Sequence, residues 1–191
     1  MPETDGGLRQ PDPTPTVGME KIIFAGPVGA GKTTAIGAIS ETPPVGTDVP
    51  CSDASRAIKA RTTVAMDYSY LLLDDGTRVH LYGTPGQERF DFMWQILAQG
   101  GIGLVLLINR DHPDPVAQME FYLDAFSGFV SETGVVIGLT RCDLVSDVSL
   151  EAFQTRLFQR GQVYPIFEID AREAADVKVL IHALLAVLGH A

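Results

Sequence analysis

The sequence predicts an α/β fold in which helices cover both faces of a mainly parallel six-stranded sheet with one antiparallel edge strand. Two observations indicate this architecture. Short apolar runs rich in β-branched residues alternate with helical segments along most of the chain. In addition, VAMDYSYLLLDDGTRVHLYG contains the Asp75-Gly76 pair, which is typical of a tight turn between two antiparallel strands. In such folds the ligand lies at the carboxyl ends of the parallel strands.

The first strand and helix enclose a phosphate-binding motif. Lys21–Ala25 (KIIFA) predicts a buried strand and Thr33–Ser40 a helix. Between them, GPVGAGKTT from Gly26 to Thr34 matches the pattern G-x-x-x-x-G-K-[ST]. Its glycines allow a concave nest of N–H donors, and the start of the following helix attracts a polyphosphate. Lys32 is expected to bridge the outer phosphates and Thr33 to bind Mg²⁺. This combination predicts the P-loop NTPase form of the fold, a three-layer sandwich.

Length and composition favour one folded domain. Of the 191 residues, 46% are hydrophobic, which is enough for a single core. Residues 1–18 contain four prolines and three glycines without periodicity, so we expect a disordered tail before a domain at 19–191. Plain fraying of the N-terminus and a docking role are both open for this tail. A formal net charge of −10 argues against nucleic acid as a partner.

Cysteine usage and hydropathy bear on the compartment. Cys51 and Cys142 are far apart and lie in no C-x-x-C motif, so they are interpreted as free thiols in a reducing cytosol. No apolar run reaches the roughly 18 residues of a membrane span, and the N-terminus lacks the pattern of a signal peptide. These features predict a cytoplasmic protein without an integral membrane segment.

The middle of the chain predicts a loop, a hairpin and a buried strand. Glu41–Arg61 has three prolines and no sustained apolar pattern, and is expected to be a long mobile loop with a function. Val64–Leu73 and Arg78–Tyr82 are expected to pair as antiparallel strands. The segment GTPGQERF then leads into a helix through Phe92–Leu97, and Gly103–Ile108 is a strand buried on both faces.

The last third repeats the alternation of helix and strand. The predicted helices are 116–130 and 150–158, and the predicted strands are 135–139 and 163–169. The final helix carries apolar residues at Val177, Leu180, Ile181, Leu184, Leu185 and Leu188. Their spacing is that of one helix face, which is interpreted as core rather than as a partner-binding groove.

Five short motifs together resemble a known family. GPVGAGKT, a Thr before the antiparallel edge strand, GTPGQE, TRCD at Thr140–Asp143 and DAR at Asp170–Arg172 follow the order and spacing of the Ras-like small GTPases. The resemblance covers residues 20–189. Within that superfamily, the T-P-G-Q sequence is most similar to the bacterial small GTPases related to the gliding-motility polarity switch, which are often encoded beside roadblock-type proteins.

The resemblance implies how a guanine base is recognised. Asp143 would accept hydrogen bonds from two guanine N–H groups that adenine does not offer. Thr140 and Arg141 stand where the family usually has Asn and Lys, and the backbone N–H of Ala171 would contact the guanine oxygen. The alternative for TRCD is a polar turn between strand and helix, with Asp143 as a helix cap.

The resemblance also implies the switch residues. Thr63, with Thr62 as the alternative, would bind Mg²⁺ and the γ-phosphate, although both also suit the start of a strand. The Gly86 N–H would meet the γ-phosphate, and Gln87 would orient the attacking water. The alternative for Gln87 is a solvated loop residue.

Two departures from the family pattern bear on hydrolysis. Gly83 stands where the family has an Asp that orients a Mg²⁺-bound water, and Val28 stands where many members have a very small residue beside the γ-phosphate. Both are expected to slow the reaction. Three carboxylates could replace the missing one, and two arginines could act in cis or simply be solvated. The carboxylates are Asp48, Asp53 and Asp67, and the arginines are Arg56 and Arg61.

The sequence therefore predicts a GTP-binding switch that hydrolyses GTP slowly to GDP. An effector, activating or roadblock-type regulatory protein is expected to dock on Val64–Leu73 and the adjoining loops. The alternatives are a nucleotide-loaded scaffold without hydrolysis and an ATP-using P-loop protein. The expected nucleotide-binding residues are Gly26, Val28, Gly29, Ala30, Gly31, Lys32, Thr33, Thr34, Gly86, Thr140, Arg141, Asp143, Ala171 and Arg172. The expected catalytic residues are Gln87, Lys32 and Thr63, and the expected Mg²⁺ ligands are Thr33 and Thr63.

Overall fold

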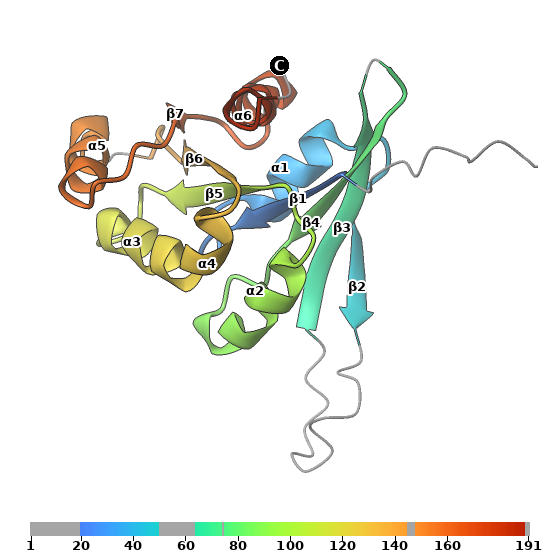
Figure 1. The fold of residues 1–191 in the computed structure, drawn as a ribbon, viewed down its shortest axis with the longest axis horizontal. Helices are drawn as coiled ribbons and strands as arrows, with labels where there is room; N and C mark the ends of the chain where they lie inside the picture. Colours follow the sequence, from blue (N-terminus) through green and yellow to red (C-terminus); the bar gives the residue numbers. More distant parts are fainter. Residues whose placement is uncertain (1–19, 50–63, 74, 145–147, 190–191) are drawn as a thin grey trace, which may run out of the picture.

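A computed structural model describes residues 20–49, 64–73, 75–144 and 148–189 of the protein (Figure 1). These residues form one sheet of seven strands in the order β2-β3-β4-β1-β5-β6-β7. The strands are β1 (Glu20–Ala25), β2 (Val45–Val49), β3 (Val64–Leu72), β4 (Arg78–Gly83), β5 (Gly103–Asn109), β6 (Gly134–Thr140) and β7 (Ile166–Glu168). The helices are α1 (Lys32–Ile39), the 3₁₀ turn η1 (Glu88–Phe90), α2 (Asp91–Ala98), α3 (Pro115–Ala125), α4 (Ser127–Val130), α5 (Leu150–Gln159) and α6 (Ala174–Val187). The expected tail at residues 1–18 lies outside the described residues.

The centre of the sheet is parallel, as the sequence predicts. β1 pairs in parallel with β4 and β5, and β6 pairs in parallel with β5 and β7. Their carboxyl ends therefore lie at one edge of the sheet. β3 is antiparallel to both of its neighbours. The hairpin between β3 and β4 is closed at Asp75-Gly76, where the Thr77 N–H donates to the Asp75 carboxylate at 2.8 Å.

The strand count and the edge differ from the sequence prediction. Val45–Val49 forms a seventh strand within the segment 41–61 that was predicted to be a loop, and it pairs with β3 from Val45 opposite Tyr68 to Val49 opposite Val64. β2, not β3, is therefore the edge strand. A five-residue strand containing Gly46 and Asp48 has weak intrinsic propensity, and its pairing with β3 supplies what the local sequence lacks.

Two further elements are shorter than predicted. The helix expected over 116–130 divides into α3 and α4 at Phe126, which caps α3 with its backbone N–H and buries its ring. The strand expected over 163–169 is reduced to β7. Val163 is 87% exposed, and Pro165 has no N–H for the ladder, although its carbonyl accepts from the Ile137 N–H at 2.9 Å.

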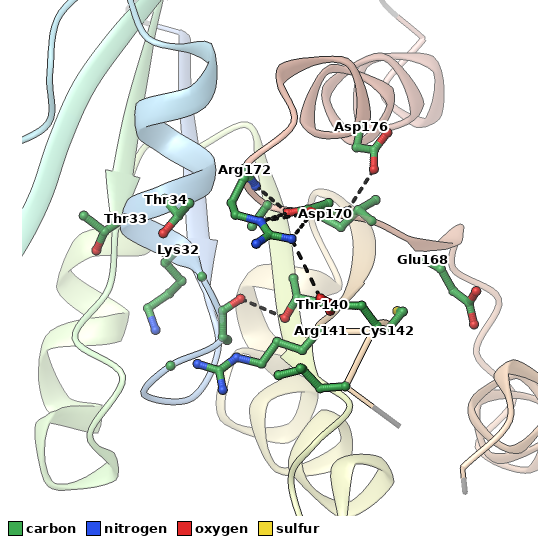
Figure 2. A pocket seen from close by; sticks show the side chains of 17 residues that line it. Lys32, Thr33, Thr34, Thr140, Arg141, Cys142, Glu168, Asp170, Arg172 and Asp176 are labelled. Carbon is green, nitrogen blue, oxygen red and sulfur yellow. Dashed lines mark hydrogen bonds and ion pairs between the residues drawn. The ribbon is translucent and has the colours of Figure 1, made fainter. Parts of the chain in front are cut away.

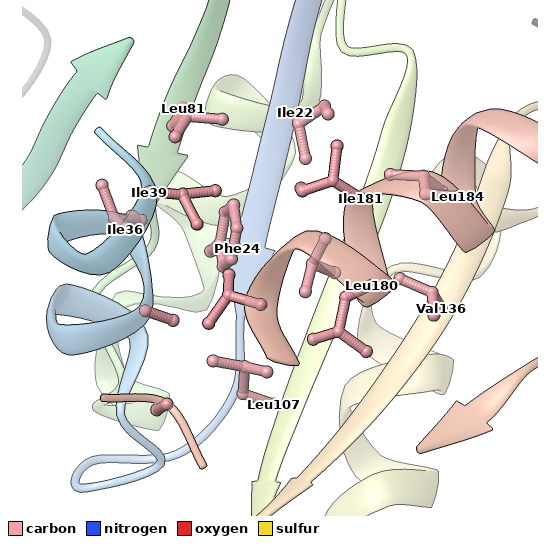
Figure 3. Packing of buried hydrophobic residues seen from close by; sticks show 14 of the residues in the cluster. Ile22, Phe24, Ile36, Ile39, Leu81, Leu107, Val136, Leu180, Ile181 and Leu184 are labelled. Carbon is pink, nitrogen blue, oxygen red and sulfur yellow. The ribbon is translucent and has the colours of Figure 1, made fainter. Parts of the chain in front are cut away.

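Helices cover both faces of the sheet, which gives three layers. On one face, α1 and α6 pack on alternate residues of the central strands, including Ile22, Phe24 and Leu107 (Figure 3). On the other face, the residues between these, such as Ile23 and Leu106, pack against α2, α3, α4 and α5. Each large aliphatic side chain buried in this way contributes about 1.5–3 kcal/mol.

The apolar face of α6 belongs to the core, as the sequence predicts. Val177, Leu180, Ile181 and Leu184 are buried, and Leu185 and Leu188 pack partly against the same cluster. Among the described residues, no helix is both long enough and apolar enough to cross a membrane.

Candidate functional site

The loop between β1 and α1, Gly26–Gly31, requires its glycines. A side chain at Gly26 would place its Cβ 1.9 Å from the Leu107 carbonyl oxygen, so the loop can pass β5 this closely only with glycine. Gly29 and Gly31 have φ angles of 81° and 89°, in the left-handed region. The loop thus turns sharply into the N-terminus of α1, the combination of backbone and helix end that binds anions.

Lys32 is held beneath this glycine loop. Its side chain is buried, and its Nζ donates to the carbonyl oxygens of Gly26 at 2.7 Å and Pro27 at 2.8 Å. Burial lowers the pKa of Lys32 to about 8, and the Asp67 carboxylate opposes this shift. Two neutral carbonyls compensate a buried ammonium poorly, so the site attracts an anion.

Thr33 contacts a carboxylate from β3. Its Oγ1 donates to Oδ2 of Asp67 at 2.5 Å. Asp67 lies directly opposite Gly83 in the β3–β4 ladder, and a Cβ at Gly83 would stand 3.0 Å from the Asp67 Cβ and 3.1 Å from its Oδ2. Among the described residues, Asp67 is thus a carboxylate that lies beside both Thr33 and Gly83. The Asp48 side chain and Asp53 fall outside the described part.

A cleft of about 650 Å³ extends from the glycine loop to the loops after β6 and β7 (Figure 2). Its volume is within the range of small-molecule sites. It brings together eleven of the expected nucleotide-binding residues, namely Gly29, Ala30, Gly31, Lys32, Thr33, Thr34, Thr140, Arg141, Asp143, Ala171 and Arg172. The sequence did not single out Cys142, Leu144, Glu168, Ile169, Asp170 and Asp176 as lining residues.

Thr140 and Arg141 both contact the glycine loop. Thr140 is buried and its Oγ1 donates to the Ala30 carbonyl at 3.0 Å, which ties the end of β6 to the loop. The Arg141 Nη2 lies 3.3 Å from the place a Cβ on Gly29 would take, so the guanidinium group covers this glycine. Arg141 also has a φ of 58°, and non-glycine residues in that region cluster at functional sites.

An acidic residue missed by the sequence analysis anchors Arg141. The Arg141 Nη1 donates to Asp111 Oδ2 at 2.7 Å, and the Asn109 Nδ2 donates to Asp111 Oδ1 at 2.8 Å. These two donors, with Asn109 the larger effect, lower the pKa of Asp111. The sequence did carry one signal for Asp111. It is a carboxylate two residues after β5, at the same edge of the sheet as the other loops.

The far end of the cleft is acidic. The Arg172 guanidinium donates from Nε to both Asp170 oxygens, at 2.8 and 3.0 Å, and lowers the pKa of Asp170 to about 2. Its Nη2 lies 3.8 Å from Asp143 Oδ2, which is beyond hydrogen-bond distance. The Asp143 carboxylate is 64% exposed and remains able to accept hydrogen bonds from a ligand. Ala171 is buried next to Gly31.

A second loop, Thr84–Gln87, follows β4 and lies at the Lys32 end. A Cβ on Gly86 would stand 2.6 Å from the Val28 backbone nitrogen and 2.8 Å from the Lys32 Nζ, so this loop lies directly against the glycine loop. Gln87 is exposed at the start of η1, and Val28 is 64% exposed. Gly26, Val28, Gly86 and Gln87 are not in the cleft lining. Gly26 accepts from the Lys32 Nζ, and Gly86 lies against Val28 and Lys32.

Four residues of the expected switch region are not described. They are Thr62, Thr63, Arg56 and Arg61. The role of Thr63, with Thr62 as the alternative, therefore stays a prediction, and so does the action of either arginine in cis. Within the described ranges, no group of three or more His, Cys, Asp or Glu side chains could hold a metal ion by itself.

Comparison with known proteins adds one partial match. No protein-family model matches the chain. The uncharacterized protein MJ1339 of Methanocaldococcus jannaschii is 32% identical over 79 residues, which make up 38% of this chain and 51% of that protein. The match thus spans about half the length of that relative.

Proposed function

We propose that this protein binds GTP and GDP with Mg²⁺, hydrolyses GTP slowly, and acts as a switch through partners that distinguish the two states. One observation carries the proposal. A glycine loop with a buried lysine lies at one end of a single cleft, and an exposed aspartate that follows a core strand lies at the other. This polarity suits a ligand with a polyphosphate at one end and a hydrogen-bond donor group at the other.

The phosphate end supports binding of a polyphosphate with Mg²⁺. Lys32 would exchange its two carbonyl partners for phosphate oxygens, which restores compensation of its charge. Mg²⁺ prefers oxygen ligands and usually keeps several waters, and it would neutralise charge on the phosphates. Thr33 would be its protein ligand, and Asp67, already bonded to Thr33, would hold a Mg²⁺-bound water in place of the missing carboxylate at Gly83.

The opposite end supports a guanine base. Asp143 would accept the two N–H donors of guanine, while the Arg141 stem would lie along the base and the Ala171 N–H would contact its oxygen. Adenine lacks both donors and would leave the carboxylate without partners in the bound state. The anchoring of Arg141 by Asp111 fixes the base end relative to the glycine loop.

Slow hydrolysis is favoured by the residues around Lys32. Gln87 is exposed next to Gly86 and would orient the attacking water, whereas the exposed Val28, whose backbone nitrogen lies close to Gly86, would crowd that water. Val28 is also the observation that favours the second candidate, a nucleotide-loaded scaffold without hydrolysis. An effector, activating or roadblock-type regulatory protein would dock on β3 and on β2 and α2, of which β2 exposes Val45 and α2 exposes Phe92 and Ile96.

The bound nucleotide provides the test of this proposal. The protein is incubated with Mg²⁺ and equal concentrations of GTP and ATP, desalted and denatured, and the released nucleotides are separated by ion-exchange chromatography. We expect guanine nucleotides to exceed adenine nucleotides at least a hundredfold, and Lys32→Ala to retain much less of either. Comparable amounts of the two bases, or more adenine, would reject the guanine assignment.

A further inference from the structure

Two helices hold the Thr84–Gln87 loop through side-chain donors. The Trp94 Nε1 on α2 donates to the Pro85 carbonyl at 2.9 Å, and the Tyr122 Oη on α3 donates to the Gly86 carbonyl at 3.1 Å. Both aromatic residues are fully buried. Consecutive carbonyls of the loop are thus fixed by two different helices.

These donors belong to one packed aromatic cluster. The Trp94 ring stacks on Tyr122, with centroids 4.8 Å apart, and on Phe126 at 5.6 Å. Burial raises the pKa of the Tyr122 phenol, and the Glu88 carboxylate adds to this effect. The phenol therefore stays protonated, and so stays a donor, throughout the neutral range. A close-packed core is poorly compressible, so a displacement at one of these stacked rings is transmitted to the others.

The same loop meets the place where a terminal phosphate would bind. The distances from a Cβ on Gly86, 2.6 Å to the Val28 nitrogen and 2.8 Å to the Lys32 Nζ, leave less room than a methyl group. A phosphate is larger than a methyl group. A terminal phosphate that enters between Gly86 and Lys32 would therefore displace Gly86, and with it the carbonyl that accepts from Tyr122.

We propose that Trp94 and Tyr122 are positioning residues that set where Gly86 and Gln87 stand relative to the terminal phosphate and that transmit its presence to α2 and α3. This inference rests on the proposed function. α2 carries the exposed Phe92 and Ile96, so its displacement changes a surface that a partner can contact. The two donors thereby connect the phosphate end of the site with that surface.

Trp94 is also the natural probe, because the protein has one tryptophan. Its emission spectrum is recorded with saturating Mg²⁺-GDP and with a non-hydrolysable Mg²⁺-GTP analogue, and bound nucleotide is quantified separately by chromatography. We expect the two states to differ in intensity or emission maximum. Tyr122→Phe keeps the stacked ring and removes only the hydroxyl donor. It should halve this difference or reduce it further, and slow single-turnover GTP cleavage roughly twofold to tenfold, the range of one lost hydrogen bond.

The matched control is Tyr164→Phe, which removes a hydroxyl from a half-buried tyrosine outside the aromatic cluster and should change neither readout. Identical emission in the two nucleotide states of wild type would overturn the inference, as would a Tyr122→Phe protein equal to wild type in both readouts. If Tyr122→Phe does not fold, Trp94→Phe, which keeps an aromatic ring and loses the N–H, must show the slowed cleavage instead. Retention of guanine nucleotide with an unresponsive Trp94 rejects this inference alone, whereas absence of retention rejects the proposed function and this inference with it.

Discussion

At the scale of single residues, the site depends on charged groups whose partners are incomplete. Lys32 is buried against two carbonyls, and Asp67 accepts from Thr33 at a place where the neighbouring strand has glycine. The burial of Lys32 costs stability in the protein alone and is compensated when a ligand supplies negative charge. Such groups are typical of binding sites rather than of structural ion pairs.

The pKa of Lys32 leads to a prediction about stability. In the folded, nucleotide-free protein it is about 8, below the ordinary value of 10.5, so the unfolded chain binds more protons between these values and stability rises with pH. From pH 8 to 10.5, wild type should gain up to about 3 kcal/mol of unfolding free energy relative to Lys32→Met. Urea unfolding of both proteins across this range measures the difference. If the unfolding free energies of wild type and Lys32→Met change with pH in the same way, the burial of the Lys32 ammonium does not destabilise the protein.

Asp67 provides a prediction about the metal. If it holds a Mg²⁺-bound water, Asp67→Asn should speed GDP release in Mg²⁺ about 10-fold to 100-fold, because the groups that orient a metal's ligands have effects of this size. Once Mg²⁺ has been chelated, GDP release from Asp67→Asn should differ little from that of wild type. The rates are followed with a fluorescent GDP derivative, and Asp91→Asn, an exposed aspartate on α2, serves as the control. If Asp67→Asn speeds GDP release equally with and without Mg²⁺, Asp67 stabilises the fold of the site and does not hold a Mg²⁺-bound water.

At the scale of elements, the sequence predicts best where a local pattern is strong. β1, the glycine loop, the hairpin at Asp75-Gly76 and the apolar face of α6 were all identified from short-range signals. β2 was missed because its pairing with β3 is not encoded in its own five residues. Phe126 breaks the predicted long helix, since tertiary burial of its ring overrides helix propensity there.

The same distinction applies to the candidate site. The residues of the glycine loop, TRCD and DAR were predicted because each motif is contiguous. Asp67 remained one of three possibilities because it lies 34 residues from its partner Thr33, and the strand register that places it there is not visible in the sequence. Asp111 and the donors Trp94 and Tyr122 act through contacts between loops and helices that no short motif records.

The two loops around Lys32 lead to a prediction about hydrolysis. Val28→Gly should raise single-turnover GTP cleavage, because it removes a side chain beside the place where Gln87 would orient water. Gln87→Leu should lower cleavage, while a partner that supplies an arginine or repositions the glutamine can be worth roughly 10³ to 10⁵ in rate. Cleavage is measured with pre-loaded nucleotide in the absence of any partner. Val28→Gly no faster than wild type would mean that Val28 is not the brake, and brisk turnover unaffected by Gln87→Leu would remove the role of Gln87.

At the scale of the whole molecule, the charge distribution requires local recognition. A protein of formal net charge −10 repels a polyphosphate at long range, so binding must come from the glycine loop, Lys32 and a metal ion acting at close quarters. The three-layer arrangement permits this because it collects the loops after β1, β4, β6 and β7 at one edge of the sheet.

The guanine preference is tested most directly by competition. A fluorescent GDP derivative is displaced from the Mg²⁺-loaded protein by GDP, ADP and XDP, for wild type and for Asp143→Asn. We predict that wild type binds GDP at least a hundredfold more tightly than ADP. Asp143→Asn should move the preference toward XDP, because the xanthine 2-oxo group accepts the hydrogen bond that the new amide donates. Equal displacement of the probe by GDP and ADP from wild type, with no change of preference in Asp143→Asn, would contradict the assignment of this cleft to a guanine nucleotide.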